Sequence, residues 1–141
     1  MVDLMKKMVI FSALVIVVLL ASCAAAQSAE EAQVNTVTIE NPYAPQAGDE
    51  ALNQDSTIVE NVRWDEANQT LTISGSLSTP CNQLRVTVTQ NNEQIDFTVY
   101  SVSEKEILCA QMLEPFEAAF KIESFDPQLF RIFINGQEMQ L

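Results

Sequence analysis

Hydrophobic and polar positions alternate along most of the chain beyond residue 57, and this alternation predicts β-strands. Apolar side chains take every second position, with mostly polar ones between them, in the segments 71–77, 84–88, 95–99, 116–122 and 130–134. A period of two places successive side chains on opposite faces of a strand, so each segment has one apolar face to bury. Nothing in this part of the chain shows the period of about 3.6 residues that a long helix requires.

The spacing of these segments predicts the fold class. Turn-forming pairs such as Asn91-Asn92 and Asn135-Gly136 follow the apolar segments. About six or seven short strands in one stretch of this size are typical of an all-β fold, a small antiparallel two-sheet sandwich. We therefore assign the sandwich domain to residues 57–141, and the strand count alone favours an immunoglobulin-like topology.

The first 26 residues have a different pattern, which predicts export. Lys6 and Lys7 precede an apolar run of 13 residues, Met8 to Leu20, that a single serine interrupts. A basic start, an apolar stretch of this length and small residues after it are typical of a secretory signal peptide. The uncharged stretch continues to Ala26 and reaches 19 residues. A membrane-spanning helix needs roughly 20, so an uncleaved anchor remains the alternative.

The residues after the apolar run favour cleavage and lipid attachment. Leu20-Ala21-Ser22-Cys23 resembles the lipobox of bacterial lipoproteins, in which a leucine and two small residues precede a cysteine. The resemblance implies that residues 1–22 are a lipoprotein signal peptide, cut between Ser22 and Cys23. It also implies a diacylglyceryl group on the Cys23 thiol and a further acyl chain, such as palmitate, on its amino group. Two acyl chains anchor a protein stably where one is marginal.

This resemblance also implies a location. A lipidated Cys23 would hold the chain in the cell membrane or the outer membrane, facing the extracytoplasmic space. Because Ala24 rather than aspartate follows the cysteine, the sorting habit of the family favours the outer membrane in a host that has one. The alternative is an ordinary signal peptide cut near Ala26, in which Cys23 has no role.

Residues 23–56 predict a lipidated flexible tether. The segment is rich in Ala, Gln, Glu and Asn, and Tyr43 is its only aromatic residue. Such a composition is typical of a spacer without a core of its own. The stretch from Val34 to Glu40 differs, because Val37 and Ile39 alternate with threonine as they would in a strand. The pattern leaves open whether this stretch adds an edge strand to the domain.

Charge and composition exclude several classes of function. The chain has 7 basic and 19 acidic side chains, three glycines and no histidine. Nucleic acid is therefore not an expected partner, because phosphate binding needs clustered Lys and Arg. Histidine-based catalysis and a glycine-rich phosphate loop are likewise excluded. We expect no cofactor and no metal site. An acidic domain stays soluble and is repelled by anionic lipid, or it binds a basic partner.

The remaining cysteines predict a disulfide. If Cys23 is lipidated, Cys81 and Cys109 are an even pair in an exported domain, where disulfides form and persist. A redox-active pair is the alternative, but the spacing is not Cys-x-x-Cys and no histidine is present to lower a thiol pKa. We therefore expect a structural bridge that closes the chain between the two cysteines.

Candidate catalytic groups are few. Without histidine a serine nucleophile needs a lysine base, and no motif surrounds Lys105 or Lys121. A carboxylate pair for glycoside hydrolysis needs a deep groove, for which a domain of this size has little room. The turn acids Asp65 and Glu66, with Asn68, lack the spacing of an EF-hand calcium loop. The sequence therefore predicts a protein that is not an enzyme.

Two functions of different class remain. The first is a membrane-anchored envelope lipoprotein that acts as a non-catalytic binding or structural module for an unidentified envelope protein or glycan. The second is a surface protease inhibitor or small hydrolase, and an inhibitory loop would be sought in the loop that the disulfide holds. Alternation also places four apolar side chains outward, which form a possible partner patch unless other segments cover them: Tyr100, Val102, Leu129 and Phe133.

Overall fold

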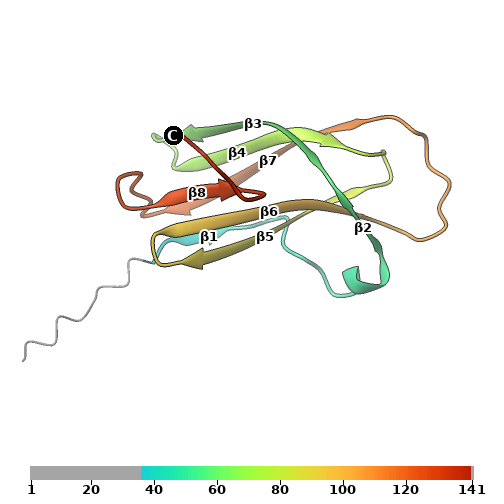
Figure 1. Cartoon of the computed structure of the whole chain (residues 1–141), viewed down its shortest axis with the longest axis horizontal. Helices are drawn as coiled ribbons and strands as arrows, with labels where there is room; N and C mark the ends of the chain where they lie inside the picture. Colours follow the sequence, from blue (N-terminus) through green and yellow to red (C-terminus); the bar gives the residue numbers. More distant parts are fainter. Residues whose placement is uncertain (1–35, 141) are drawn as a thin grey trace, which may run out of the picture. The chain divides into compact units, whose positions relative to one another are not determined.

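The computed structural model describes residues 36–140, which belong to one compact unit (Figure 1). Nine strands and one short 3-10 helix make up its regular structure in this range. In chain order these are β1 Thr38–Glu40, η1 Asp49–Ala51, β2 Asn53–Ser56, β3 Ile58–Asp65, β4 Thr70–Leu77, β5 Gln83–Asn91, β6 Gln94–Ser103, β7 Glu114–Glu123, β8 Arg131–Ile134 and β9 Gln137–Glu138.

The strands form two sheets, so the predicted all-β sandwich is confirmed. The four-stranded sheet has the order β1-β7-β4-β3, and all of its pairs are antiparallel. The five-stranded sheet is built around β6, which pairs with β5 along one edge. The other edge of β6 is shared by β2, opposite residues 100–103, and β8, opposite residues 94–97, and β9 continues outward from β8.

The strand order differs from the immunoglobulin-like topology expected from the strand count. The sheets of an immunoglobulin domain are antiparallel, and the last two strands of its chain are neighbours in one sheet. Here β6 and β8 run parallel, while the intervening strand β7 lies in the other sheet. The chain therefore passes from one sheet to the other between β6 and β8. Parallel strands require such a crossover connection.

The core lies between the two sheets and follows the predicted alternation. Phe97 from β6 and Phe120 from β7 meet edge to face, with ring centroids 5.2 Å apart. Around them lie the other large side chains of the core cluster that are fully buried, namely Leu71, Ile73, Ile95, Ile122, Ile132 and Val86. Burying each such side chain stabilises the fold by about 1.5–3 kcal/mol, so this cluster is the main source of stability.

The domain begins before residue 57, which corrects the tether predicted for residues 23–56. Within the described range, β1 pairs with the end of β7, where Thr38 lies opposite Glu123. The side chain of Val37 is only 6% exposed and belongs to the core. The strand-like pattern between Val34 and Glu40 therefore does mark an edge strand.

The residues after β1 continue around the sandwich. The Val86 amide donates to the Tyr43 carbonyl at 2.8 Å, and the Asn41 side chain donates to the Val86 carbonyl at 2.7 Å. These bonds cover part of the free edge of β5. The Tyr43 ring packs against Phe120 at 5.7 Å, and further along the chain β2 pairs with β6. Residues 37–56 therefore form a strap that holds both sheets.

An ion pair fixes the middle of this strap. Arg85, on β5, donates to both carboxylate oxygens of Asp49, from Nε at 2.8 Å and from Nη2 at 3.1 Å. The Arg85 side chain is 7% exposed and that of Asp49 is 14% exposed. The guanidinium, together with an amide hydrogen bond from Gln46, holds the pKa of Asp49 below its usual value. The pair therefore ties the strap to the outer face of the five-stranded sheet.

We expect the ion pair to make the stability depend on pH. A carboxyl group whose pKa is lowered by folding stabilises the fold above its unfolded pKa of about 3.9, and this contribution disappears as the pH falls through the folded pKa. Asp49→Asn should therefore lower the melting temperature at pH 7. It should also make the fall in melting temperature between pH 7 and pH 3 smaller than in the wild type. Glu66→Gln, in an exposed turn, is the control. An unchanged pH dependence in Asp49→Asn would contradict the assignment.

The strap and the loops define two opposite ends of the sandwich. The described chain enters beside the last residues of β7, whereas the connection from β6 enters β7 at its first residue, Glu114. Figure 1 shows the entry and this connection at opposite ends of the long strands. No helix among residues 36–140 is long and apolar enough to cross a membrane.

Candidate functional site

A disulfide joins two loops at the end of the sandwich away from residue 36. Cys81 lies in the connection from β4 to β5, and Cys109 lies in the connection from β6 to β7. Their Cα atoms are 6.1 Å apart, within the range of about 4.4–6.8 Å that a bridge allows. The predicted pairing is confirmed. Because both connections pass from one sheet to the other, the bridge ties the two crossings together.

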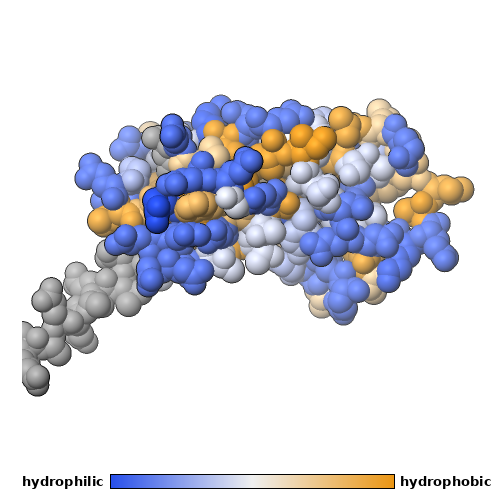
Figure 2. All heavy atoms as spheres, viewed as in Figure 1, coloured by the Kyte–Doolittle hydropathy of each residue, from blue (hydrophilic) through white to orange (hydrophobic). Residues whose placement is uncertain are grey.

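The connection from β6 to β7, residues 104–113, carries most of the exposed large hydrophobic side chains and is called the bridge loop below. Among the described residues, six large hydrophobic side chains are exposed, and four of them lie on this loop. Their exposed fractions are 48% for Ile107, 100% for Leu108, 58% for Met112 and 56% for Leu113. Figure 2 shows hydrophobic residues at this end of the molecule. Four exposed large apolar side chains on one loop make it a candidate interaction surface.

Buried polar side chains support the loops behind this surface. Asn82 follows Cys81 and is 7% exposed. Its amide donates to Asp55 on β2 and to the Ser101 hydroxyl on β6, both at 3.0 Å, and its side-chain carbonyl accepts from Thr79 at 2.6 Å. Every buried polar atom of this network has a partner, as a rigid polar cluster requires. The network therefore fixes the loop that holds Cys81.

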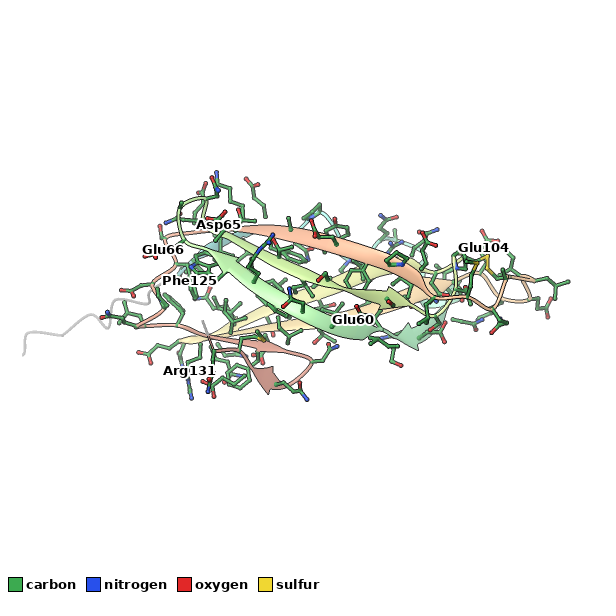
Figure 3. The ribbon with its side chains drawn as sticks, turned by 90° about the horizontal axis from the view of Figure 1, so that it is seen from above. Glu60, Asp65, Glu66, Glu104, Phe125 and Arg131 are labelled. Carbon is green, nitrogen blue, oxygen red and sulfur yellow. A yellow bond between two sulfur atoms is a disulfide. The ribbon has the colours of Figure 1, made fainter. Side chains whose placement is uncertain are left out.

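A small pocket of about 300 Å³ lies beside the disulfide. Both cysteines line it, with the carboxylates of Asp55, Glu104 and Glu106 and with several amides and hydroxyls. Figure 3 shows Glu104 close to the disulfide. Among the described residues, no group of three or more His, Cys, Asp or Glu side chains is arranged to hold a metal ion. The acidic lining favours a cationic group over an anion.

Comparison with known families assigns the fold. Residues 71–141 match the family described as the ORF11 beta-sandwich domain. The chain belongs to this family. The match runs from β4 to the end of the chain, so it includes both cysteines and the bridge loop of this ORF11 β-sandwich domain. No curated protein and no solved structure matches the chain.

The four residues predicted as a partner patch are not brought together in this ORF11 β-sandwich domain. Tyr100 on β6 lies opposite Ser56, and Phe133 on β8 lies opposite Asp96, four positions away along β6. Both side chains are half-buried, and the Arg131 guanidinium lies 5.9 Å from the centre of the Phe133 ring. Leu129 is 44% exposed in the connection after β7. No single apolar surface therefore links them.

The prediction that Val102 belongs to this patch is also corrected, because the residue is only 2% exposed. It is not part of the core cluster, so it does point away from the core as the alternation predicts. It lies opposite Gln83, whose side chain accepts from Arg85, and Arg85 binds Asp49 of the strap. The strap thus crosses the same face as Val102. The alternative that other chain segments cover the outward residues holds at this position.

The turn acids of this ORF11 β-sandwich domain have local roles. Asp65 accepts from the Asn68 amide at 3.2 Å and from the Asn68 side chain at 2.7 Å. These hydrogen bonds lower the pKa of Asp65 and close the turn between β3 and β4. Figure 3 shows Asp65 and Glu66 at the end opposite Glu104. Asp65 and Glu66 therefore form no common site with Glu104.

A second hollow, of about 480 Å³, lies where β1, β7 and β4 meet. Glu40, Thr70 and Lys121 line it with apolar atoms of Pro42 and Ala119. The Lys121 ammonium lies 3.5 Å from the Glu123 carboxylate, and both side chains are half exposed. This hollow offers no converging set of buried polar groups.

Cys23 and Ser22, the predicted lipidation and cleavage residues, lie outside the described range.

Proposed function

We propose that the chain is a membrane-anchored envelope lipoprotein and that its sandwich is a non-catalytic binding module. The lipobox resemblance at Leu20-Ala21-Ser22-Cys23 supports the anchor. The proposed anchor is the cell membrane or the outer membrane, with the domain facing the extracytoplasmic space. The proposed partner is an envelope protein or glycan.

One observation carries the binding role. The bridge loop places four exposed apolar side chains at the end of the sandwich opposite the chain entry at residue 36. A module tethered through its N-terminal side would thus present this loop away from the point of attachment. Large exposed apolar side chains on a supported loop are what a binding surface requires.

Radioactive palmitate labelling tests the anchor. Cells producing the full chain should incorporate label. Cys23→Ala should abolish the label and the membrane-bound mature form, because the thiol takes the diacylglyceryl group before the signal is cut and the new amino group is acylated. Ser28→Ala, outside the lipobox, is the control and should label like the wild type. A Cys23→Ala protein that is still cut before residue 23 and still sediments with membranes would contradict the proposal.

A protease inhibitor is the second candidate function, and the exposure of Leu108 favours it. This side chain is 100% exposed and directly precedes the disulfide-bonded Cys109. A single exposed side chain on a covalently held loop can enter the specificity pocket of a protease, and fixing the loop beforehand lowers the entropic cost of binding.

A further inference from the structure

The bridge loop holds Leu108 with an accessible backbone as well as an accessible side chain. After Leu108, the Cys109 carbonyl accepts from the Gln111 side chain at 3.5 Å, and the Ala110 carbonyl accepts from the Met112 amide at 3.0 Å. The chain turns at Lys105 and Glu106, and beyond this turn none of the described residues donates to or accepts from the backbone of Leu108. The Leu108 backbone can therefore pair with the edge of another protein's strand, as substrates do in protease clefts.

We infer that Leu108 is the primary specificity residue of a protease-binding loop, and that the partner is an endopeptidase with an apolar specificity pocket. Such a pocket accepts one exposed leucine, whereas the flanking backbone pairs with the cleft. This inference rests on the proposed binding function and names the partner class for the same surface.

The charges around the loop favour this partner over two other occupants. Glu104, Lys105 and Glu106 lie on the loop, and Glu114 begins β7 directly after it, so three carboxylates outnumber one ammonium at this end. Anionic lipid would repel these carboxylates, and two copies meeting through this end would bring like charges together. A cleft that takes a single side chain leaves the carboxylates at its rim, where basic groups of the partner can meet them.

The fold explains how such a loop resists a protease. Hydrolysis of the Leu108–Cys109 bond would add one water, giving a carboxylate on Leu108 and an amine on Cys109. The new ends would stay tethered to the same domain, because Cys109 is bonded to Cys81 and Leu108 follows the last residue of β6, Ser103, by five positions. Reclosure, which releases the water again, is then a reaction between neighbouring groups and is favoured by their proximity.

Inhibition assays with the full chain in mild detergent test the inference. Chymotrypsin, which has an apolar pocket, should be inhibited stoichiometrically, and trypsin should not. Leu108→Arg should weaken the inhibition of chymotrypsin about 100-fold or more and create inhibition of trypsin. The matched control is Leu129→Arg, the same change at an exposed leucine after β7, and it should inhibit like the wild type.

Several outcomes would overturn the inference. One is a wild-type chain that leaves chymotrypsin and subtilisin fully active, or that is cut after Leu108 and released. If the wild type binds phosphatidylcholine vesicles and Leu108→Arg abolishes this binding, the loop binds a lipid bilayer instead. If the wild type forms a dimer that Leu108→Arg dissociates, the loop binds a second copy of the chain. The melting temperature of Leu108→Arg should match that of the wild type. If it does not, the inhibition assays use Leu108→Ser in place of Leu108→Arg. Palmitate labelling of Cys23 is measured separately, so a failed inhibition assay does not contradict the proposed lipid anchor.

Discussion

Replacing Cys81 and Cys109 together by serine is expected to lower the free energy of unfolding by about 2–5 kcal/mol. The bridge closes a loop that contains β5 and β6, and the chain-entropy estimate for a loop of this length is about 3.6 kcal/mol. For a domain of this size the loss corresponds to a fall in melting temperature of about 10 °C or more. Thermal unfolding of the oxidised wild type and the double variant measures it.

Reduction provides the matching control for this result. Dithiothreitol should lower the melting temperature of the wild type to that of the double serine variant, and it should leave the variant unchanged. The bridge joins the two crossings between the sheets, so its loss should free the bridge loop before the core opens. If the oxidised and reduced wild type melt at the same temperature, the bridge does not stabilise the fold.

The strands and the core were predictable because they depend on local sequence. The period of two at Leu71, Ile73 and Leu77 identifies both the strand and its buried face, and all three side chains are buried. The same alternation does not say which strands are neighbours. The parallel pairing of β6 with β8 depends on where the chain crosses between sheets, which leaves no mark in the hydrophobic pattern.

The strap was assigned to the tether because its contacts are non-local. β1 has only three residues, and backbone hydrogen bonds to β7 hold it. Asp49 lies in a polar stretch, and nothing near it in the sequence shows that it pairs with Arg85, 36 positions away. The composition of residues 23–56 is therefore a poor guide to order, because a few long-range bonds fix the part that the structure describes.

The candidate site was only partly predictable. The two cysteines located the loop correctly, because an even number of cysteines in a domain expected to be exported predicts a disulfide. The doublets Ile107-Leu108 and Met112-Leu113 have no period, so the sequence does not distinguish exposed side chains from buried ones. The outward position of Val102 was predictable, but its cover was not, because the strap that crosses this face comes from a distant part of the chain.

Gly75→Ala is expected to destabilise the fold severely, through its contact with β3. A Cβ atom at residue 75 would lie 1.9 Å from the Ile58 carbonyl oxygen and 3.1 Å from the Phe116 ring. β3 has a register shift between Val59 and Asn61, and Gly75 pairs with Val59 just beside it. The clash involves a backbone oxygen, so no side-chain rotation relieves it, and we expect a loss of about 3 kcal/mol or more.

The only tryptophan of the chain makes this loss visible in β3 itself. Trp64 lies on β3 and packs edge to face against Phe125, with ring centroids 4.8 Å apart. If the alanine forces β3 away from β4, the Trp64 emission should shift to longer wavelength before the rest of the sandwich melts, because the ring loses its contact and meets water. Ser78→Ala, at an exposed position just after β4, should leave both emission and melting temperature unchanged. A Gly75→Ala protein with wild-type emission and melting temperature would show that β3 does not approach β4 this closely.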